Sequence, residues 1–240
     1  MVNVESDSLT SEAAEIRDLF DRIATQYDEL NDRLSLGLHR VWKLMAVKWC
    51  NPQPGDTALD LCCGSGDLAL MLAKKVGKEG KVIGLDFACQ QLEIAASRAA
   101  KTLPGHSIDW QEGDALNLPF ADNYFDCATM GYGLRNVTDI PRSLREIYRV
   151  LKPGSAIAIL DFHRPESAIT NAFQQWYLQQ IVIPTARSLN MTEEYTYLLP
   201  SLAKFPQGKE QVNLAYGVGF TRAVHYPLIG GMMGVLVLHK

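Results

Sequence analysis

Apolar residues along this chain follow two periods that alternate. Short, nearly continuous apolar runs predict strands buried on both faces, and stretches with an apolar residue at every third or fourth position predict amphipathic helices. The predicted strands span residues 58–63, 81–86, 107–112, 124–130 and 156–162, with helical stretches between most of them. This alternation indicates an α/β fold built on a doubly wound, mostly parallel sheet.

Further helices lie before the first strand and after the fifth. Residues 14–30 and 39–50 have apolar residues at helical spacing, so we expect an N-terminal helical segment over 14–50. Residues 164–207 break the alternation and predict an inserted helical cap, whose main helix is expected to end near Pro184. A helix at 209–218 and strands at 220–227 and 232–238 complete a seven-stranded sheet in one domain spanning residues 1–240.

The composition is that of an ordinary globular enzyme, with 47% hydrophobic and 21% charged residues. A net charge of −4 and a pI of about 5.7 argue against a protein held to nucleic acid by its overall field. The five cysteines lack C-x-x-C spacing, so we expect reduced thiols and neither a zinc site nor a disulfide framework.

The sequence indicates neither a targeting signal nor a membrane span. The first residues are polar and acidic, without the apolar core of a signal peptide or the basic bias of a transit peptide. The longest apolar run, residues 228–238, is too short to cross a bilayer. We therefore expect a cytoplasmic protein whose contact with a membrane would be peripheral. Nothing in the sequence indicates an oligomeric state.

A glycine loop, Gly64-Ser65-Gly66, follows the first strand and precedes a helix. Such a loop turns tightly, lets a ligand approach the backbone, and directs helical N–H groups at it. The pattern also fits a dinucleotide site, or a generic turn between a strand and a helix. Asp60, inside the strand, would repel a pyrophosphate but would favour the ammonium and sulfonium groups of S-adenosylmethionine. Asp60 therefore argues against an NAD-dependent oxidoreductase.

Two more acids follow the next two strands. Asp86, with Phe87 after it, is placed to accept hydrogen bonds from both ribose hydroxyls of the cofactor. Asp114 suits the amino group of adenine, with Ala115 beside the ring, although a surface turn would also explain that acid. Gly131, after the fourth strand, would contact the cofactor only through its backbone. Acids at three successive strand ends favour a cofactor site.

Several segments resemble signatures of the C-methyltransferases of quinone biosynthesis, which act on demethylmenaquinone and on ubiquinone precursors. The first signature is matched by Tyr27-Asp28, Asn31, Ser35, His39 and Trp42, the second by Arg149-Val150-Leu151-Lys152-Pro153-Gly154, and a further element by residues 133–137. The match covers nearly the whole chain. It implies a class I, Rossmann-like methyltransferase that uses S-adenosylmethionine.

Other elements are similar to the cyanobacterial and plastid branch of this family, which methylates 2-phytyl-1,4-naphthoquinone in phylloquinone synthesis. They are residues 62–66, 130–135 and 159–162, with His225-Tyr226 and Gly230-Gly231 near the end of the chain. The sequence departs from the wider family at Leu30, where a Met is usual, and at Asp161, where a Glu is usual.

The resemblance implies that a methyl group passes to a ring carbon of a naphthoquinol. The oxidised quinone ring is electrophilic, whereas the quinol is electron-rich and can attack the methyl carbon. Arg135 and Asn136 are our candidates for polarising the quinol oxygen, with Arg135 acting through a water because its pKa is too high for a base. A structural salt bridge from Arg135 to Asp139 or Glu146 is the alternative.

Residues from three parts of the chain are candidates for the quinol pocket. Tyr27 and His39 would close it from the N-terminal side, and His39 is also a candidate catalytic residue, with a helix cap or a core hydrogen bond as the alternative. Tyr132 and Trp176 complete the predicted substrate contacts. The membrane-dissolved prenyl tail requires the pocket to meet a membrane surface, and the aromatic helix of the cap, residues 172–183, has a suitable composition. Ordinary core packing would explain these aromatics equally well.

Other functions remain open at this point. The substrate could be a demethylmenaquinol or a polyprenyl benzoquinol, and the chain could be a quinone-binding module without catalysis. A nucleic-acid methyltransferase is disfavoured by the acidic pI and by the absence of an N-P-P-Y element after the fourth strand.

Overall fold

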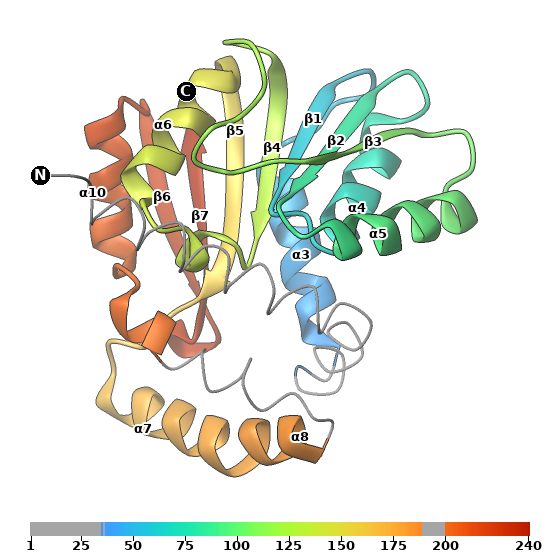
Figure 1. Cartoon of the computed structure of the whole chain (residues 1–240). Coiled ribbons are helices and arrows are strands. Elements are labelled where there is room, and N and C mark those ends of the chain that lie inside the picture. The colour runs from blue at the N-terminus through green and yellow to red at the C-terminus, as the bar shows by residue number, and fades with distance from the viewer. Residues whose placement is uncertain (1–34, 36, 189–199) are drawn as a thin grey trace, which may run out of the picture.

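A computed structural model describes residues 35, 37–188 and 200–240 of the chain (Figure 1). Its centre is a seven-stranded sheet in the order β3-β2-β1-β4-β5-β7-β6. The strands are β1 (Thr57–Leu61), β2 (Lys81–Asp86), β3 (Ser107–Glu112), β4 (Phe125–Gly131), β5 (Leu151–Phe162), β6 (Arg222–Leu228) and β7 (Met233–His239). All pairings are parallel except those of β7 with β5 and β6. The predicted doubly wound sheet is confirmed.

Helices cover both faces of the sheet (Figure 1). One face is covered by α3 (Leu38–Trp49), α4 (Asp67–Val76) and α5 (Cys89–Thr102), and the other by α6 (Ile140–Val150) and α10 (Gly208–Val218). Strand β1 shows why the apolar residues of these strands do not alternate with polar ones. Leu59 and Leu61 belong to the core on the α6 side, while Ala58 belongs to the core beneath α4. Burial on both faces therefore replaces the usual polar alternation.

The fifth strand begins earlier than the sequence predicts. Lys152, Pro153 and Gly154 precede the predicted strand 156–162 and are typical of a turn, but they lie within β5. The register of β4 and β5 shifts here, because Phe125 pairs with Leu151 and Cys127 pairs with Ala156. A bulge absorbs the turn-forming residues without ending the strand.

The cap forms a helical layer beyond the end of β5 (Figure 1). It consists of α7 (Ala168–Tyr177), a π-helical turn (Leu178–Val182) and α8 (Ile183–Ser188). The expected end near Pro184 is wrong, because the chain stays helical through this proline. The preceding π-turn changes the hydrogen-bonding pattern where proline has no N–H to donate, and the Thr185 hydroxyl bonds the Ile181 carbonyl at 2.6 Å.

The second predicted N-terminal helix is confirmed as α3, within one residue at each end. The first, at 14–30, lies outside the described residues, as do Tyr27 and residues 189–199 of the cap. Within the described part of the chain, no helix is both long and apolar enough to span a membrane.

Candidate functional site

The strand order reverses between β1 and β4, and the ends of these two strands carry unusual backbone geometry. Cys62 and Tyr132, directly after the two strands, are non-glycine residues with φ of 54° and 61°. Such left-handed conformations cost of order 1–3 kcal/mol each and concentrate at functional sites. The two loops also pack back to back, since a Cβ on Gly133 would lie 2.6 Å from Cys62 Cβ. This switch point is where open α/β sheets bind ligands.

The glycine loop is held tightly against its neighbours. Gly64 and Gly66 have φ of 51° and 87°, and a Cβ on Gly66 would lie 2.6 Å from the Trp110 ring. Helix α4 begins directly afterwards, at Asp67. The turn predicted from the two glycines is therefore present, and its backbone conformation explains the residue type at both positions.

Two basic residues from neighbouring helices bind the glycine loop and the start of α4, and neither is among the predicted site residues. Lys43 of α3 lies 2.6 Å from Asp67, and Arg98 of α5 bonds the Ser65 carbonyl and hydroxyl at 2.8 Å each. Arg98 also pairs with Asp67. Although burial opposes ionisation of Asp67, the charges of Lys43 and Arg98 hold its pKa at about 2. The sequence signal was weak, because these partners lie 24 and 31 positions from Asp67.

Asp60 lies beneath the glycine loop with no exposed surface. Its carboxylate accepts hydrogen bonds from the Ala69 backbone N–H, in the first turn of α4, and from the Thr129 hydroxyl of β4, both at 2.8 Å. Burial raises its pKa to about 7, against the opposing effect of these two bonds. Asp60 therefore ties the start of α4 to β4 directly behind the loop.

Asp86 also supports the loop. One carboxylate oxygen accepts from Gly64 N–H at 2.8 Å and the other from Ala88 N–H at 3.0 Å. Phe87, which follows Asp86 in the chain, is half-buried. Gly113 N–H bonds the Asp86 carbonyl at 3.0 Å, which joins the ends of β2 and β3.

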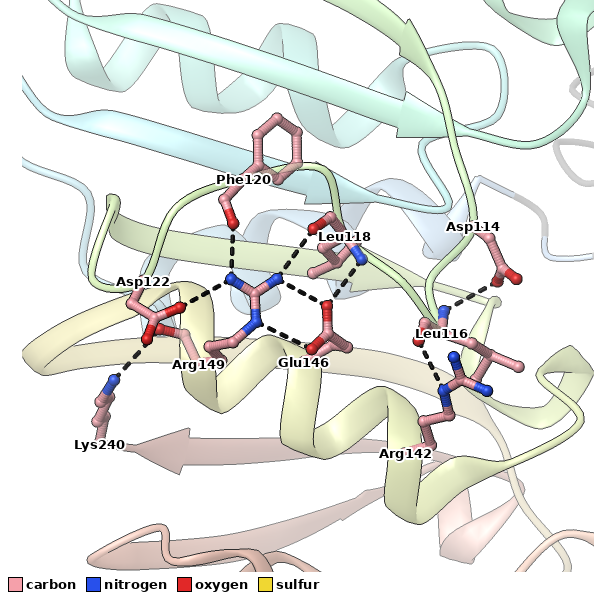
Figure 2. A network of polar contacts seen from close by, with 9 residues as sticks. All are labelled: Asp114, Leu116, Leu118, Phe120, Asp122, Arg142, Glu146, Arg149 and Lys240. Carbon is pink, nitrogen blue, oxygen red and sulfur yellow. Dashed lines mark hydrogen bonds and ion pairs between the residues drawn. The ribbon is translucent and has the colours of Figure 1, made fainter.

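Asp114 is exposed just after β3, and its Oδ1 accepts from Leu116 N–H at 2.8 Å (Figure 2). The next residue, Ala115, is buried. Across the site, Gly131 ends β4, and a Cβ there would lie 2.7 Å from Leu68 of α4. The predicted cofactor residues thus lie at the carboxyl ends of β1 to β4.

Arg135 forms a buried ion pair with Asp161 at the end of β5, where the two side chains are 6% and 1% exposed. The backbone N–H of Arg135 also bonds Asp161, at 3.1 Å. The partners considered for Arg135 in its structural role are therefore wrong. Asp139 instead caps α6 by accepting from Arg142 N–H, and Glu146 pairs with Arg149. The partner is Asp161, which the sequence analysis singled out only as a departure from the family.

Asn136 has an amide oxygen that is buried and has no hydrogen-bond partner among the described residues. Its amide nitrogen donates to the Tyr132 carbonyl at 3.2 Å, so the side chain is oriented and the oxygen remains an acceptor. The Tyr132 ring is buried against Phe162 of β5, with ring centroids 5.3 Å apart. A buried acceptor of this kind is costly unless a ligand donates to it.

The two remaining predicted residues in the described part of the chain, His39 and Trp176, lie on other elements, α3 and α7. His39 is buried on α3, and its Nδ1 lies 2.7 Å from the Ser35 hydroxyl. Trp176 of α7 is 52% exposed, so core packing does not explain it. Neither of these residues has a described contact with Arg135 or Asn136.

None of the five cysteines, all of which lie in the described part of the chain, forms a disulfide. Burial raises the pKa of the Cys62 and Cys63 thiols well above their ordinary value, so both are neutral near pH 7. Neither is therefore suited to act as a thiolate nucleophile.

Residues 8–240 match the model of the ubiE/COQ5 methyltransferase family. The chain belongs to this family. A relative from Nostoc named 2-phytyl-1,4-naphtoquinone methyltransferase is 61% identical over 94% of this chain and 98% of its own length. A relative of the same name from Synechocystis is 54% identical over 98% and 100%. The chloroplastic 2-phytyl-1,4-beta-naphthoquinone methyltransferase of Arabidopsis thaliana is 52% identical over 93% and 86%.

Solved structures support the fold. A SAM-dependent methyltransferase from Thermotoga maritima has a TM-score of 0.64 at 22% identity, covering 93% of this chain and 98% of its own. Another from Aquifex aeolicus has a TM-score of 0.59 at 20% identity, covering 82% and 88%. The ubiE/COQ5 member described here therefore has the class I methyltransferase fold, and its cofactor is S-adenosylmethionine.

The residues at the site fit this cofactor chemically. Asp60 and Asp86 lie in β1 and β2, and Asp114 follows the neighbouring β3. Three carboxyl groups at this edge of the sheet suit a nucleoside that bears sulfonium and ammonium charges. Such a set would oppose a pyrophosphate.

Proposed function

We propose that this methyltransferase transfers a methyl group to a ring carbon of 2-phytyl-1,4-naphthoquinol. The observation that carries the proposal is identity of 52–61% over 93% or more of the chain to relatives from cyanobacteria and a plant that carry this substrate in their names. When bound, S-adenosylmethionine supplies the methyl group on a sulfonium centre.

The cofactor is held by residues at the ends of β1 to β4. Asp86 binds the ribose hydroxyls and Asp114 the adenine amino group, with Phe87 and Ala115 beside them. Gly64, Ser65, Gly66 and Gly131 give the backbone surface against which the cofactor lies. Asp60 favours its positive charges from beneath the loop, where burial strengthens the field of a carboxylate.

Asn136 selects the reduced ring. Its buried Oδ1 accepts a hydrogen bond, and a quinol hydroxyl donates one, whereas a quinone carbonyl does not. Accepting that hydrogen bond increases electron density on the oxygen and hence on the adjacent ring carbon. Arg135, held by Asp161, orients a water that takes the hydroxyl proton, and its positive charge stabilises the developing oxyanion. Tyr132, whose carbonyl accepts from Asn136 and whose ring packs on Phe162, contacts the substrate, and His39 closes the pocket from α3.

The cap meets the membrane that contains the phytyl tail. Ile169, Phe173 and Trp176 follow helical spacing along α7 and are 85%, 49% and 52% exposed, so they form one outward apolar stripe. The inner side of the same helical layer is anchored by Leu178 and Val182, which are buried. An apolar outer face with no charged residue in α7 suits insertion at the level of lipid headgroups.

A panel of quinols tests the substrate. Purified protein and methyl-labelled S-adenosylmethionine are incubated anaerobically with 2-phytyl-1,4-naphthoquinol, a demethylmenaquinol and a polyprenyl benzoquinol, and label in the extracted lipid is counted. We expect the highest kcat/KM with the phytyl naphthoquinol. A higher value for either other quinol would reassign the substrate, and absence of label from all three would leave only a binding module.

The stripe is tested separately with Phe173→Ser and Trp176→Ser in one protein. Turnover of the phytyl substrate in liposomes should fall by an order of magnitude or more, because each buried CH₂ contributes roughly 0.8 kcal/mol. Turnover of a short-chain, water-soluble quinol should stay normal. Tyr216→Ser is the control, because Tyr216 is 50% exposed on α10, outside the cap. Equal losses on both substrates would remove the membrane role.

A further inference from the structure

The loop between β3 and β4 is fastened to helix α6 along its length (Figure 2). Arg142 donates from Nε to the Leu116 carbonyl at 2.9 Å. Arg149 donates to the Leu118 carbonyl at 2.9 Å and to the Phe120 carbonyl at 2.6 Å. Two arginines of one helix thus hold the backbone at every second residue, so α6 determines the path of the loop.

Arg149 uses its whole guanidinium in this network. Besides the two carbonyls, it bonds both carboxylate oxygens of Glu146, at 2.9 and 2.7 Å, and Asp122 at 2.9 Å. These contacts engage all five N–H donors of an arginine. Glu146 in turn accepts from Leu118 N–H at 2.8 Å. Lysine, with a single nitrogen, could not reproduce this planar arrangement.

The network contributes more to the position of the loop than to its stability. The side chains of Arg149 and Asp122 are 31% and 69% exposed, and exposed ion pairs stabilise proteins little. Burial of Ala115 and Leu118, at 6% and 3% exposure, anchors the apolar underside of the loop. The hydrogen bonds from α6 instead determine the position of the loop backbone at Leu116, Leu118 and Phe120.

The held segment begins at Asp114. Leu116 is held at both backbone groups, because Arg142 bonds its carbonyl and its N–H donates to Asp114 Oδ1 at 2.8 Å. Asn117 N–H bonds the Asp114 carbonyl at 3.0 Å, which closes the turn. A shift of the loop on α6 would therefore turn the Asp114 carboxylate as well.

We propose that Arg149, supported by Arg142, is a positioning residue for recognition of the purine 6-amino group by Asp114. This inference rests on the proposed cofactor site. It assigns a task to the first residue of the Arg149–Gly154 signature, which the chemistry at Arg135 and Asn136 does not explain. Arg149 itself does not touch the cofactor; it sets the orientation of the acid that does.

The test compares binding of S-adenosylmethionine with that of its analogue in which a carbonyl oxygen replaces the purine 6-amino group. Calorimetry of the unaltered protein should show about tenfold preference for the amino form, which corresponds to about 1.4 kcal/mol. Arg149→Lys should reduce this preference to twofold or less. Arg145→Lys is the matched control, because Arg145 is exposed on the same helix, and it should keep the full preference.

Two further variants serve as controls. One provides a second test if Arg149→Lys misfolds, and the other distinguishes positioning of Asp114 from a general loss of stability. Arg142→Ala removes the single hydrogen bond to the Leu116 carbonyl and should reduce the preference partly if Arg149→Lys does not fold. Asp114→Ala should abolish the preference, and the double variant with Arg149→Lys should bind S-adenosylmethionine no more weakly than Asp114→Ala alone, because both act on one contact.

Additive losses, or a full tenfold preference retained in Arg149→Lys and Arg142→Ala, would overturn the inference. Failure of the unaltered protein to bind S-adenosylmethionine would instead overturn the proposed function, so the two failures are distinguishable.

Discussion

Asp60→Asn separates what a buried carboxylate does for stability from what it does for cofactor binding. Asparagine has nearly the same shape and can keep both contacts, since its amide oxygen accepts from Ala69 N–H and its amide nitrogen can donate to the Thr129 hydroxyl. The substitution therefore removes the charge with little change in packing.

The sign of the stability effect follows from the pKa. Burial raises the pKa of Asp60 from 3.8 to about 7, so the folded protein binds a proton more tightly than the unfolded chain. The cost of ionisation is absent below pH 3.8, grows as pH rises to about 7, and is complete above that. At about 1.4 kcal/mol per unit, the cost at pH 8 is at most about 4 kcal/mol. Asp60→Asn should therefore unfold at a higher temperature than the unaltered protein at pH 8, with the gain shrinking toward pH 4.

Binding should change in the opposite direction. A cationic cofactor favours the ionised carboxylate, so affinity should fall as Asp60 takes up a proton. With a pKa of about 7, only about one site in a hundred is ionised at pH 5, and the apparent Kd should be roughly a hundredfold weaker than at pH 9. In Asp60→Asn the affinity should be low and nearly independent of pH over this range.

Calorimetric titration with S-adenosylmethionine from pH 5 to pH 9, together with thermal unfolding at each pH, measures both effects. Repeating the titration in buffers of different ionisation enthalpy detects the proton released on binding. If Asp60→Asn binds as tightly as the unaltered protein at pH 8, or if the two pH profiles are parallel, the electrostatic role of Asp60 is wrong.

Three further variants test other parts of the site and fold. Asp86→Ala should weaken S-adenosylmethionine binding at least tenfold, at roughly 1.5–3 kcal/mol per charged hydrogen bond; unchanged affinity by calorimetry would reassign Asp86. Arg135→Lys should lower kcat about a hundredfold while cofactor affinity and the melting temperature stay near normal, because Lys keeps the charge beside Asp161 but lacks the planar fork; a large loss of stability would favour a purely structural pair. His163, 4% exposed with its Nε2 3.1 Å from that of His225, has its pKa lowered by burial from 6.5 to about 3. The unfolded chain therefore binds the extra proton, and acidification from pH 7 to pH 5 should destabilise the protein by about 2 kcal/mol. His163→Gln should show a flatter dependence in thermal unfolding, and identical slopes would place the acid sensitivity elsewhere.

The sheet could be predicted from local sequence because its strands are buried on both faces and therefore read as apolar runs. Strands β2 and β3 match their predicted bounds, and the acids at their ends lie where the pattern indicated. Turn-forming residues were less reliable guides. Pro153-Gly154 and Pro184 predict breaks, but a bulge and a π-helical turn keep β5 and the cap helix continuous.

Long-range polar partners could not be predicted from local pattern. Asp161 was visible as a departure from the family, yet nothing in its spacing connects it to Arg135, which lies 26 positions earlier. The same applies to Lys43 and Arg98 at the glycine loop. Lysine and arginine are common on protein surfaces, so their presence in the sequence does not indicate a partly buried contact with the loop. The exposure of the aromatic side chains on α7 could not be predicted from their spacing either. The structure shows that Phe173 and Trp176 are exposed and that Tyr177 is partly buried.

The central claim is that the electron-rich, reduced ring is the methyl acceptor. The most direct measurement follows transfer of labelled methyl from S-adenosylmethionine to 2-phytyl-1,4-naphthoquinone under strict exclusion of oxygen, with and without prior chemical reduction, at equal cofactor saturation. We expect label in the extracted lipid only after reduction, because the quinol alone can donate a hydrogen bond from its hydroxyl to Asn136 and has a nucleophilic ring carbon. Equal rates with the reduced and oxidised forms, or no transfer to the quinol, would contradict the account.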